Sequence, residues 1–137
     1  MSASAAPSRP KPRPFKLTSP VPDEHSLHVS VADALNYLLP GDAIFASFDL
    51  ANAASPIEGA RKRRKSCLAG WPDCSVWWRS RVVLLELKRE RHGALSKAQR
   101  ELHPRLEEAG FPVTVCTSVE DVLETVVRAG IPLRGRL

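Results

Sequence analysis

Residues 70–88 read GWPDCSVWWRSRVVLLELK, with two apolar runs on either side of the pair Arg79-Ser80. Short runs rich in valine and tryptophan that are separated by two residues predict a β-hairpin. With Arg79-Ser80 as the turn, Trp78 faces Arg81 and, further along the strands, Asp73 faces Glu86. Arg-Ser is not among the favoured hairpin turns, so the register rests on the two apolar runs.

This pairing predicts two carboxylates at one edge of a sheet. Directly opposed residues of antiparallel strands have β-carbons about 4.5–5.5 Å apart, and two carboxylates at that distance repel unless a cation lies between them or one is protonated. Lys88 shares a face with Glu86, whereas Leu87 points to the other face and into the core. Carboxylates suit Mg²⁺, and the ammonium group can orient a water or stabilise negative charge, as phosphodiester hydrolysis requires. The alternative is a surface salt-bridge network on a charged strand.

The remaining pattern predicts an α/β fold. A helix begins after Asp23, a plausible N-cap, and ends at Pro40-Gly41. The other predicted elements are a strand over 43–50, a short helix near 57–68, strands over 74–78 and 81–88, a helix over 97–109 with Ser96 as N-cap, a strand over 112–117 and a last helix after Ser118. The strand–helix–strand crossover that follows the hairpin implies a mixed β-sheet flanked by helices.

The length of 137 residues suits one folded domain. Residues 1–22 are rich in Ser, Ala, Pro and basic residues, which predicts a disordered or extended basic arm before a domain over 23–137. No apolar run approaches the roughly 18 residues of a membrane span, and no apolar segment follows the basic N-terminus as in a secretory signal. The three cysteines lack a disulfide pattern. These features predict a cytoplasmic protein without a membrane partner.

Positive charge is concentrated near the predicted hairpin. The formal net charge is +5, and the residues predicted to contact nucleic acid are Arg61, Lys62, Arg63, Arg64, Lys65, Arg89 and Arg91. Clustered positive charge is what phosphate neutralisation needs. The alternative for the run 61–65 is a solvated loop or helix face.

Three motifs together resemble the VRR-NUC family of the PD-(D/E)XK nuclease superfamily, in particular its stand-alone phage and bacterial members. They are Gly-x-Pro-Asp at 70–73, Leu-Glu-Leu-Lys at 85–88, and Gly-Ala-Leu-Ser-Lys-Ala-Gln at 93–99. The combination is specific, although each motif alone is not. The resemblance covers about residues 23–130 and implies a restriction-endonuclease-like αβββαβ core with flanking helices.

The resemblance also implies roles for individual residues. The metal ligands it implies are Glu24, Asp73, Glu86 and the backbone carbonyl of Leu87. The catalytic residues it implies are Asp73, Glu86 and Lys88, with Gln99 supporting the site from the following helix. The implied cofactor is Mg²⁺ or Mn²⁺. Glu24 has an alternative reading as an acid favoured in the first turn of a helix, and Gln99 as an ordinary exposed helix residue.

Histidine and tryptophan residues are open to other interpretations. His25 and His28 lie one helical turn apart, but no further ligands complete a zinc site, and His103 is expected at the surface rather than as a general base. Trp71, next to the carboxylate motif, is a candidate for stacking on bases. Since neighbouring strand residues point to opposite faces, at least one of the pair 77–78 is expected in the core.

These observations predict a Mg²⁺-dependent DNA endonuclease that is selective for DNA structure, such as a Holliday junction or other branched DNA. One site per chain cuts two strands symmetrically only if two copies associate, which predicts a homodimer. The alternative is a non-catalytic basic DNA-binding module, or a nuclease subunit that needs a larger partner.

Overall fold

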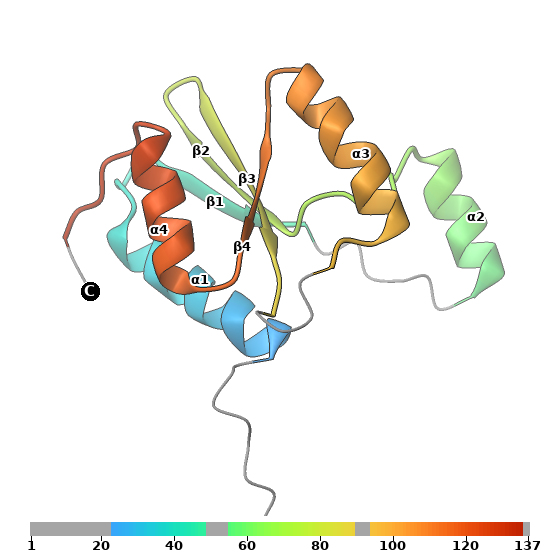
Figure 1. Ribbon diagram of the computed structural model, residues 1–137, viewed down its shortest axis with the longest axis horizontal. Helices are drawn as coiled ribbons and strands as arrows, with labels where there is room; N and C mark the ends of the chain where they lie inside the picture. Colours follow the sequence, from blue (N-terminus) through green and yellow to red (C-terminus); the bar gives the residue numbers. More distant parts are fainter. Residues whose placement is uncertain (1–22, 49–54, 90–93, 136–137) are drawn as a thin grey trace, which may run out of the picture.

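The computed structural model describes residues 23–48, 55–89 and 94–135, which form one four-stranded sheet and four helices (Figure 1). The predicted arm over 1–22 and the basic residue Arg91 lie outside the described residues. The elements are α1 (Glu24–Leu38), β1 (Ile44–Ser47), α2 (Pro56–Arg64), β2 (Cys74–Trp78), β3 (Arg81–Leu87), α3 (Lys97–Glu108), β4 (Val113–Cys116) and α4 (Val119–Arg128). No described helix has the length and apolar character needed to cross a membrane.

The sheet is mixed, as predicted. Its strand order is β1-β2-β3-β4; β1, β2 and β3 are antiparallel neighbours, and β3 pairs with β4 in parallel through the α3 crossover. Alternate residues of β2 and β3, among them Val76 and Leu85, form the main core with apolar residues of α1 and α4. On the opposite face of the sheet, the Glu86 side chain points toward α3. The site therefore lies on the face that does not hold the main core.

The hairpin has the predicted register, with Trp78 paired to Arg81 and Cys74 paired to Leu85. Arg79 and Ser80 both adopt positive φ values, 43° and 67°, as a two-residue turn of the favoured hairpin type requires. Asp42 accepts hydrogen bonds from Trp78 Nε1 at 2.9 Å and Arg79 Nε at 3.1 Å. The Arg79 guanidinium also lies 4.6 Å from the centre of the Trp78 ring. The Asp42 hydrogen bonds from outside the hairpin, together with this contact within it, stabilise a turn that the Arg-Ser sequence does not favour.

Two predicted elements are shorter in the structure. The predicted strand over 43–50 is the four-residue β1, and the predicted helix near 57–68 is α2, which begins at Pro56 after the N-cap Ser55 and ends at Arg64. Ser66 has a φ of 62°, a left-handed conformation that a helix cannot continue through. The segment 67–71 therefore runs as a loop toward β2.

Gly70 packs its backbone directly against the first turn of α3. Its φ is 84°, and a β-carbon there would lie 2.5 Å from the carbonyl carbon and oxygen of Ala98 and 2.7 Å from the Gln99 nitrogen. Glycine is therefore required at this position for both its conformation and its close approach. This contact fixes α3 relative to the start of β2.

We expect Gly70→Ala to lower the free energy of unfolding by about 2–4 kcal/mol, because it combines left-handed strain with a clash against backbone. Urea unfolding followed by circular dichroism measures this loss. Gly41→Ala is the matched control, since a β-carbon at Gly41 meets nothing within 4 Å. Equal stability of the two variants would contradict the assigned contact.

Candidate active site

Asp73 is held between β1 and β3, immediately before β2. Its N–H donates to the Leu85 carbonyl at 3.0 Å, and its carbonyl accepts from the Phe48 N–H at 2.8 Å. Its carboxylate Oδ2 accepts a 2.7 Å hydrogen bond from the Leu87 N–H. The preceding Pro72 is fully buried, so both the backbone and the side chain of Asp73 are fixed.

Glu86 is a buried carboxylate in the middle of the site, with only 1% of its surface exposed. Its Oε1 accepts a hydrogen bond from Gln99 Nε2 at 2.5 Å and lies 3.3 Å from Lys88 Nζ. Its Oε2 is buried and has no hydrogen-bond partner among the described residues. Buried polar atoms are almost always paired, so this oxygen marks a position suited to a group from outside the protein.

Burial raises the pKa of Glu86 to about 7. The negative charge of Asp73 raises this pKa further, whereas the ammonium of Lys88 opposes the shift. The carboxyl group therefore ionises near neutral pH, and a cation placed against it would favour the ionised form.

Gln99 connects the first turn of α3 to Glu86. Its Oε1 accepts from the Ser96 N–H at 2.9 Å, and the Ser96 Oγ accepts from the Gln99 N–H at 3.2 Å. This reciprocal capping box leaves the Gln99 amide N–H₂ free to donate to Glu86. The Gln99 side chain therefore has two roles: it accepts from a backbone N–H at the start of the helix, and it orients the buried carboxylate of Glu86.

Leu87 and Lys88 end β3 beside the two carboxylates. The Leu87 side chain is buried in the core, as predicted, and its N–H points to Asp73. In a strand the N–H and C=O of one residue point to the same side, so the Leu87 carbonyl also points toward Asp73. The Lys88 N–H donates to the Cys116 carbonyl at 3.0 Å, and its side chain is 14% exposed.

Glu24 lies on a separate element from the two carboxylates. It is an exposed residue in the first turn of α1, and the described ranges contain no group of three or more His, Cys, Asp or Glu side chains arranged for a metal ion. The neighbouring Asp23 has a lowered pKa, chiefly because the Ser26 N–H donates to it and to a smaller extent because of the positive charge of Arg89. The start of α1 shares a cleft with Asp73, because His25 in its first turn lines the same cleft.

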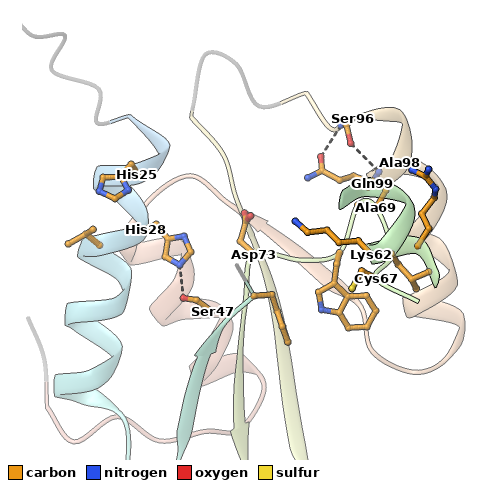
Figure 2. A pocket seen from close by; sticks show the side chains of 17 residues that line it. His25, His28, Ser47, Lys62, Cys67, Ala69, Asp73, Ser96, Ala98 and Gln99 are labelled. Atoms are coloured by element: carbon orange, nitrogen blue, oxygen red, sulfur yellow. Dashed lines mark hydrogen bonds between the residues drawn. The ribbon is translucent and has the colours of Figure 1, made fainter. Parts of the chain in front are cut away.

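A cleft of about 860 Å³ opens beside Asp73 (Figure 2). Its walls come from α1, the end of β1, α2, the loop over 67–71 and the first turn of α3. Figure 2 shows His25 and His28 on one side of Asp73, and Lys62 and Gln99 on the other. A 2.8 Å hydrogen bond joins His28 Nε2 and Ser47 Oγ. The sequence pattern did not predict that the two histidines line a cleft beside Asp73, because their spacing indicates only that they share a helix face.

The predicted nucleic-acid-binding residues fall into two groups. Lys62 and Arg63 line the cleft. The side chains of Arg61, Arg64 and Lys65 are exposed at the C-terminal end of α2. Arg89 is half-buried just after β3. Positive charge therefore lies both within the cleft and beside it.

His103 was expected at the surface, and that expectation is wrong. It is 8% exposed on the buried side of α3, one turn after Gln99. Burial lowers its pKa, against the effect of a hydrogen bond with the Gly70 backbone. The nearby Leu102 signals the buried face of α3, but nothing in the local pattern distinguishes a buried histidine from an exposed one.

Comparisons with known proteins identify the family of the chain. A family model described as the VRR-NUC domain matches residues 16–120. One similar solved structure, titled "VRR_NUC domain protein", has a TM-score of 0.59 and 15% sequence identity, and the match covers 80% of this chain and 88% of that chain. At this identity the structural likeness concerns the fold alone. No curated protein is significantly similar. Because the family model spans most of its length, the chain belongs to the VRR-NUC domain family.

Proposed function

We propose that this chain is a divalent-metal-dependent DNA endonuclease of the PD-(D/E)XK type. A VRR-NUC domain is a nuclease-family domain, which makes DNA the expected substrate. The observation that carries the proposal is the buried Glu86, whose Oε2 has no partner among the described residues and whose Oε1 is held by Lys88 and Gln99. Burying such a group without a ligand costs stability, which a purely structural carboxylate would avoid.

The residues present fit a hard divalent cation. Asp73, Glu86 and the Leu87 carbonyl offer only oxygen atoms, which suit Mg²⁺ and Mn²⁺, and Glu24 is the further acid proposed as a ligand. When bound, such an ion polarises a phosphate oxygen and lowers the pKa of a water molecule.

The protein's own side chains would position the reaction. Lys88 is held 3.3 Å from Glu86 Oε1, where its ammonium can orient the attacking water or stabilise charge that develops on the phosphate. Gln99 fixes the rotamer of Glu86, and the Leu87 N–H fixes that of Asp73. Because these contacts exist before substrate binds, little reorganisation is needed during the reaction.

The finer proposal is selectivity for a Holliday junction or other branched DNA by a homodimer. The described part of each chain carries one pair of site carboxylates, Asp73 and Glu86, so symmetric cleavage of two strands would need two copies. The basic residues of α2, together with Arg89, would bind the backbone phosphates.

Lys88→Ala is expected to lower the rate of metal-dependent cleavage by roughly 10²–10³-fold, as for other single groups that stabilise transition-state charge. Binding of DNA should largely persist, because the basic residues of α2 remain. The measurement compares cleavage of labelled four-way-junction, flap, duplex and single-stranded DNA with Mg²⁺, Mn²⁺ or EDTA.

Lys97→Ala is the matched control for charge removal. Its side chain is 84% exposed, and its ammonium lies 3.9 Å from Glu101 in a surface ion pair, so cleavage should be unchanged. DNA binding without cleavage of any substrate by the unaltered chain would refute the enzyme and favour a binding module, or a subunit that needs a partner. Preferred cutting of duplex over junction and flap DNA would refute the branched-DNA proposal.

Glu86→Gln is expected to stabilise the metal-free protein while abolishing cleavage. The pKa of Glu86 is 4.5 in its usual environment and about 7 in the folded chain. Between these two pH values the folded chain holds a proton that unfolding releases. The free energy of unfolding therefore falls as pH rises. The glutamine does not titrate. The free energy of unfolding of Glu86→Gln should therefore rise above that of the unaltered chain between pH 5 and 8. At roughly 1.4 kcal/mol per pKa unit, the difference should reach a maximum of about 3 kcal/mol. Thermal melts in EDTA measure the difference.

Asp121→Asn is a control of opposite sign. Hydrogen bonds from Thr117 lower the pKa of Asp121, so this variant should lose stability at pH 8 rather than gain it.

Saturating Mg²⁺, at about 100 times its Kd, should add about 2.7 kcal/mol to the free energy of unfolding of the unaltered chain and little to that of Glu86→Gln. Loss of stability in Glu86→Gln at pH 8 would mean that the carboxylate is structural.

A further inference from the structure

Two aromatic rings line the cleft beside Asp73. Phe48 follows β1, Trp71 lies two residues before Asp73, and both contribute to the cleft wall. Their ring centres are 5.8 Å apart and their planes meet at 88°, an edge-to-face contact. Both side chains are only partly buried, so the aromatic pair remains accessible from the cleft.

Trp71 is held rigidly at this position. Gly70 on one side packs backbone to backbone against Ala98, and Pro72 on the other side is fully buried. The Trp71 backbone is therefore fixed between two anchored residues, and Asp73 follows directly. An aromatic ring at a fixed place beside a reactive group can position a ligand as well as bind it.

The same cleft holds the cationic side chains of Lys62 and Arg63, which enter from α2. The imidazole of His28 lines it from α1. Aromatic surface for a base combined with positive charge for a phosphate is the chemistry that binds single-stranded nucleic acid.

The volume of the cleft limits how many nucleotides it can hold. About 860 Å³ lies within the range of roughly 300–1,000 Å³ that holds a small-molecule ligand. A cleft of this size takes one or two nucleotides rather than a turn of duplex, and a base reaches an aromatic ring only when it is not stacked and paired in a helix.

We infer that Trp71 stacks on an unpaired base of the substrate and selects DNA that has an unpaired nucleotide next to the cleaved phosphate. For its consequence in cleavage this inference rests on the proposed nuclease function. Its consequence in binding does not, so the two can be tested separately.

The first test measures binding by the full chain in EDTA, using fluorescence anisotropy. The probes are a forked duplex with a thymine single-stranded arm and the same fork with abasic tetrahydrofuran residues in that arm. The unaltered chain should bind the thymine fork roughly 5- to 150-fold more tightly, the range that corresponds to stacking of one base. Trp71→Ala should bind both forks equally, with the affinity of the unaltered chain for the abasic fork.

Two further variants separate stacking from folding. Trp71→Phe keeps an aromatic face and should retain part of the preference for thymine, even if the alanine variant unfolds in a thermal melt. Trp77→Ala is the matched control: Trp77 is 44% exposed but lies outside the cleft, so its removal should leave the preference unchanged. Equal binding of the two forks by the unaltered chain, or equal weakening of both by Trp71→Ala, would overturn the inference.

The second test repeats the comparison in cleavage with Mg²⁺ or Mn²⁺. The ratio of kcat/KM between the two forks should match the ratio of affinities in the unaltered chain and fall to one in Trp71→Ala. Absence of cleavage in every combination would refute the nuclease proposal, whereas the binding ratios would still decide whether Trp71 reads an unpaired base. Cleavage of both forks at the same rate by the unaltered chain would overturn the inference alone.

Discussion

The close contact between the Gly70 backbone and the first turn of α3 is the constraint on which the site depends. It allows the start of α3 to approach β2 without an intervening side chain. Gln99, in that first turn, then reaches Glu86 on the neighbouring strand, while Ser96 caps the helix that carries it. One helical turn after Gln99, His103 forms a hydrogen bond with the backbone of the same glycine. The loop before β2, the helix and the buried carboxylate therefore hold one another in place.

The buried carboxylate is a liability for the free protein. Removing Glu86 from water raises its pKa to about 7, and one of its oxygens has no partner within the described part of the chain. A core built only for stability would place an apolar residue here, since replacing buried charges by apolar groups is often neutral or stabilising. Lys88 and Gln99 pair only one of the two carboxylate oxygens, and ionisable groups with such strongly shifted pKa values are concentrated at functional sites.

The sequence predicted most of what depends on local rules. The N-caps Asp23, Ser96 and Ser118 were visible because short polar side chains bond the first helical N–H groups, and the apolar pattern predicted the hairpin register. The limits of α2 were not visible, because the positive φ of Ser66 has no strong signal in its residue type.

Features formed by residues far apart in the chain could not be predicted from local sequence patterns. Asp42 stabilises the turn at Arg79 from a position 37 residues earlier, and the cleft histidines acquire their surroundings only when α1 packs against the sheet. Among the proposed site residues, Asp73 and Glu86 could be placed near one another because the hairpin register sets their distance. The position of Glu24 could not, since it depends on how a separate helix docks.

The distribution of charge explains how a site built on carboxylates can accept a polyanion. Asp73 and Glu86 by themselves repel phosphate, and within a buried environment that repulsion is strong. Lys88 offsets part of this charge at the centre, and Lys62 and Arg63 add positive charge across the cleft. The basic residues gather at the C-terminal end of α2, where the helix dipole also favours them. Since α2 buries none of its residues, packing does not explain its basic composition, and the proposed attraction of a phosphate backbone toward the carboxylates would account for it.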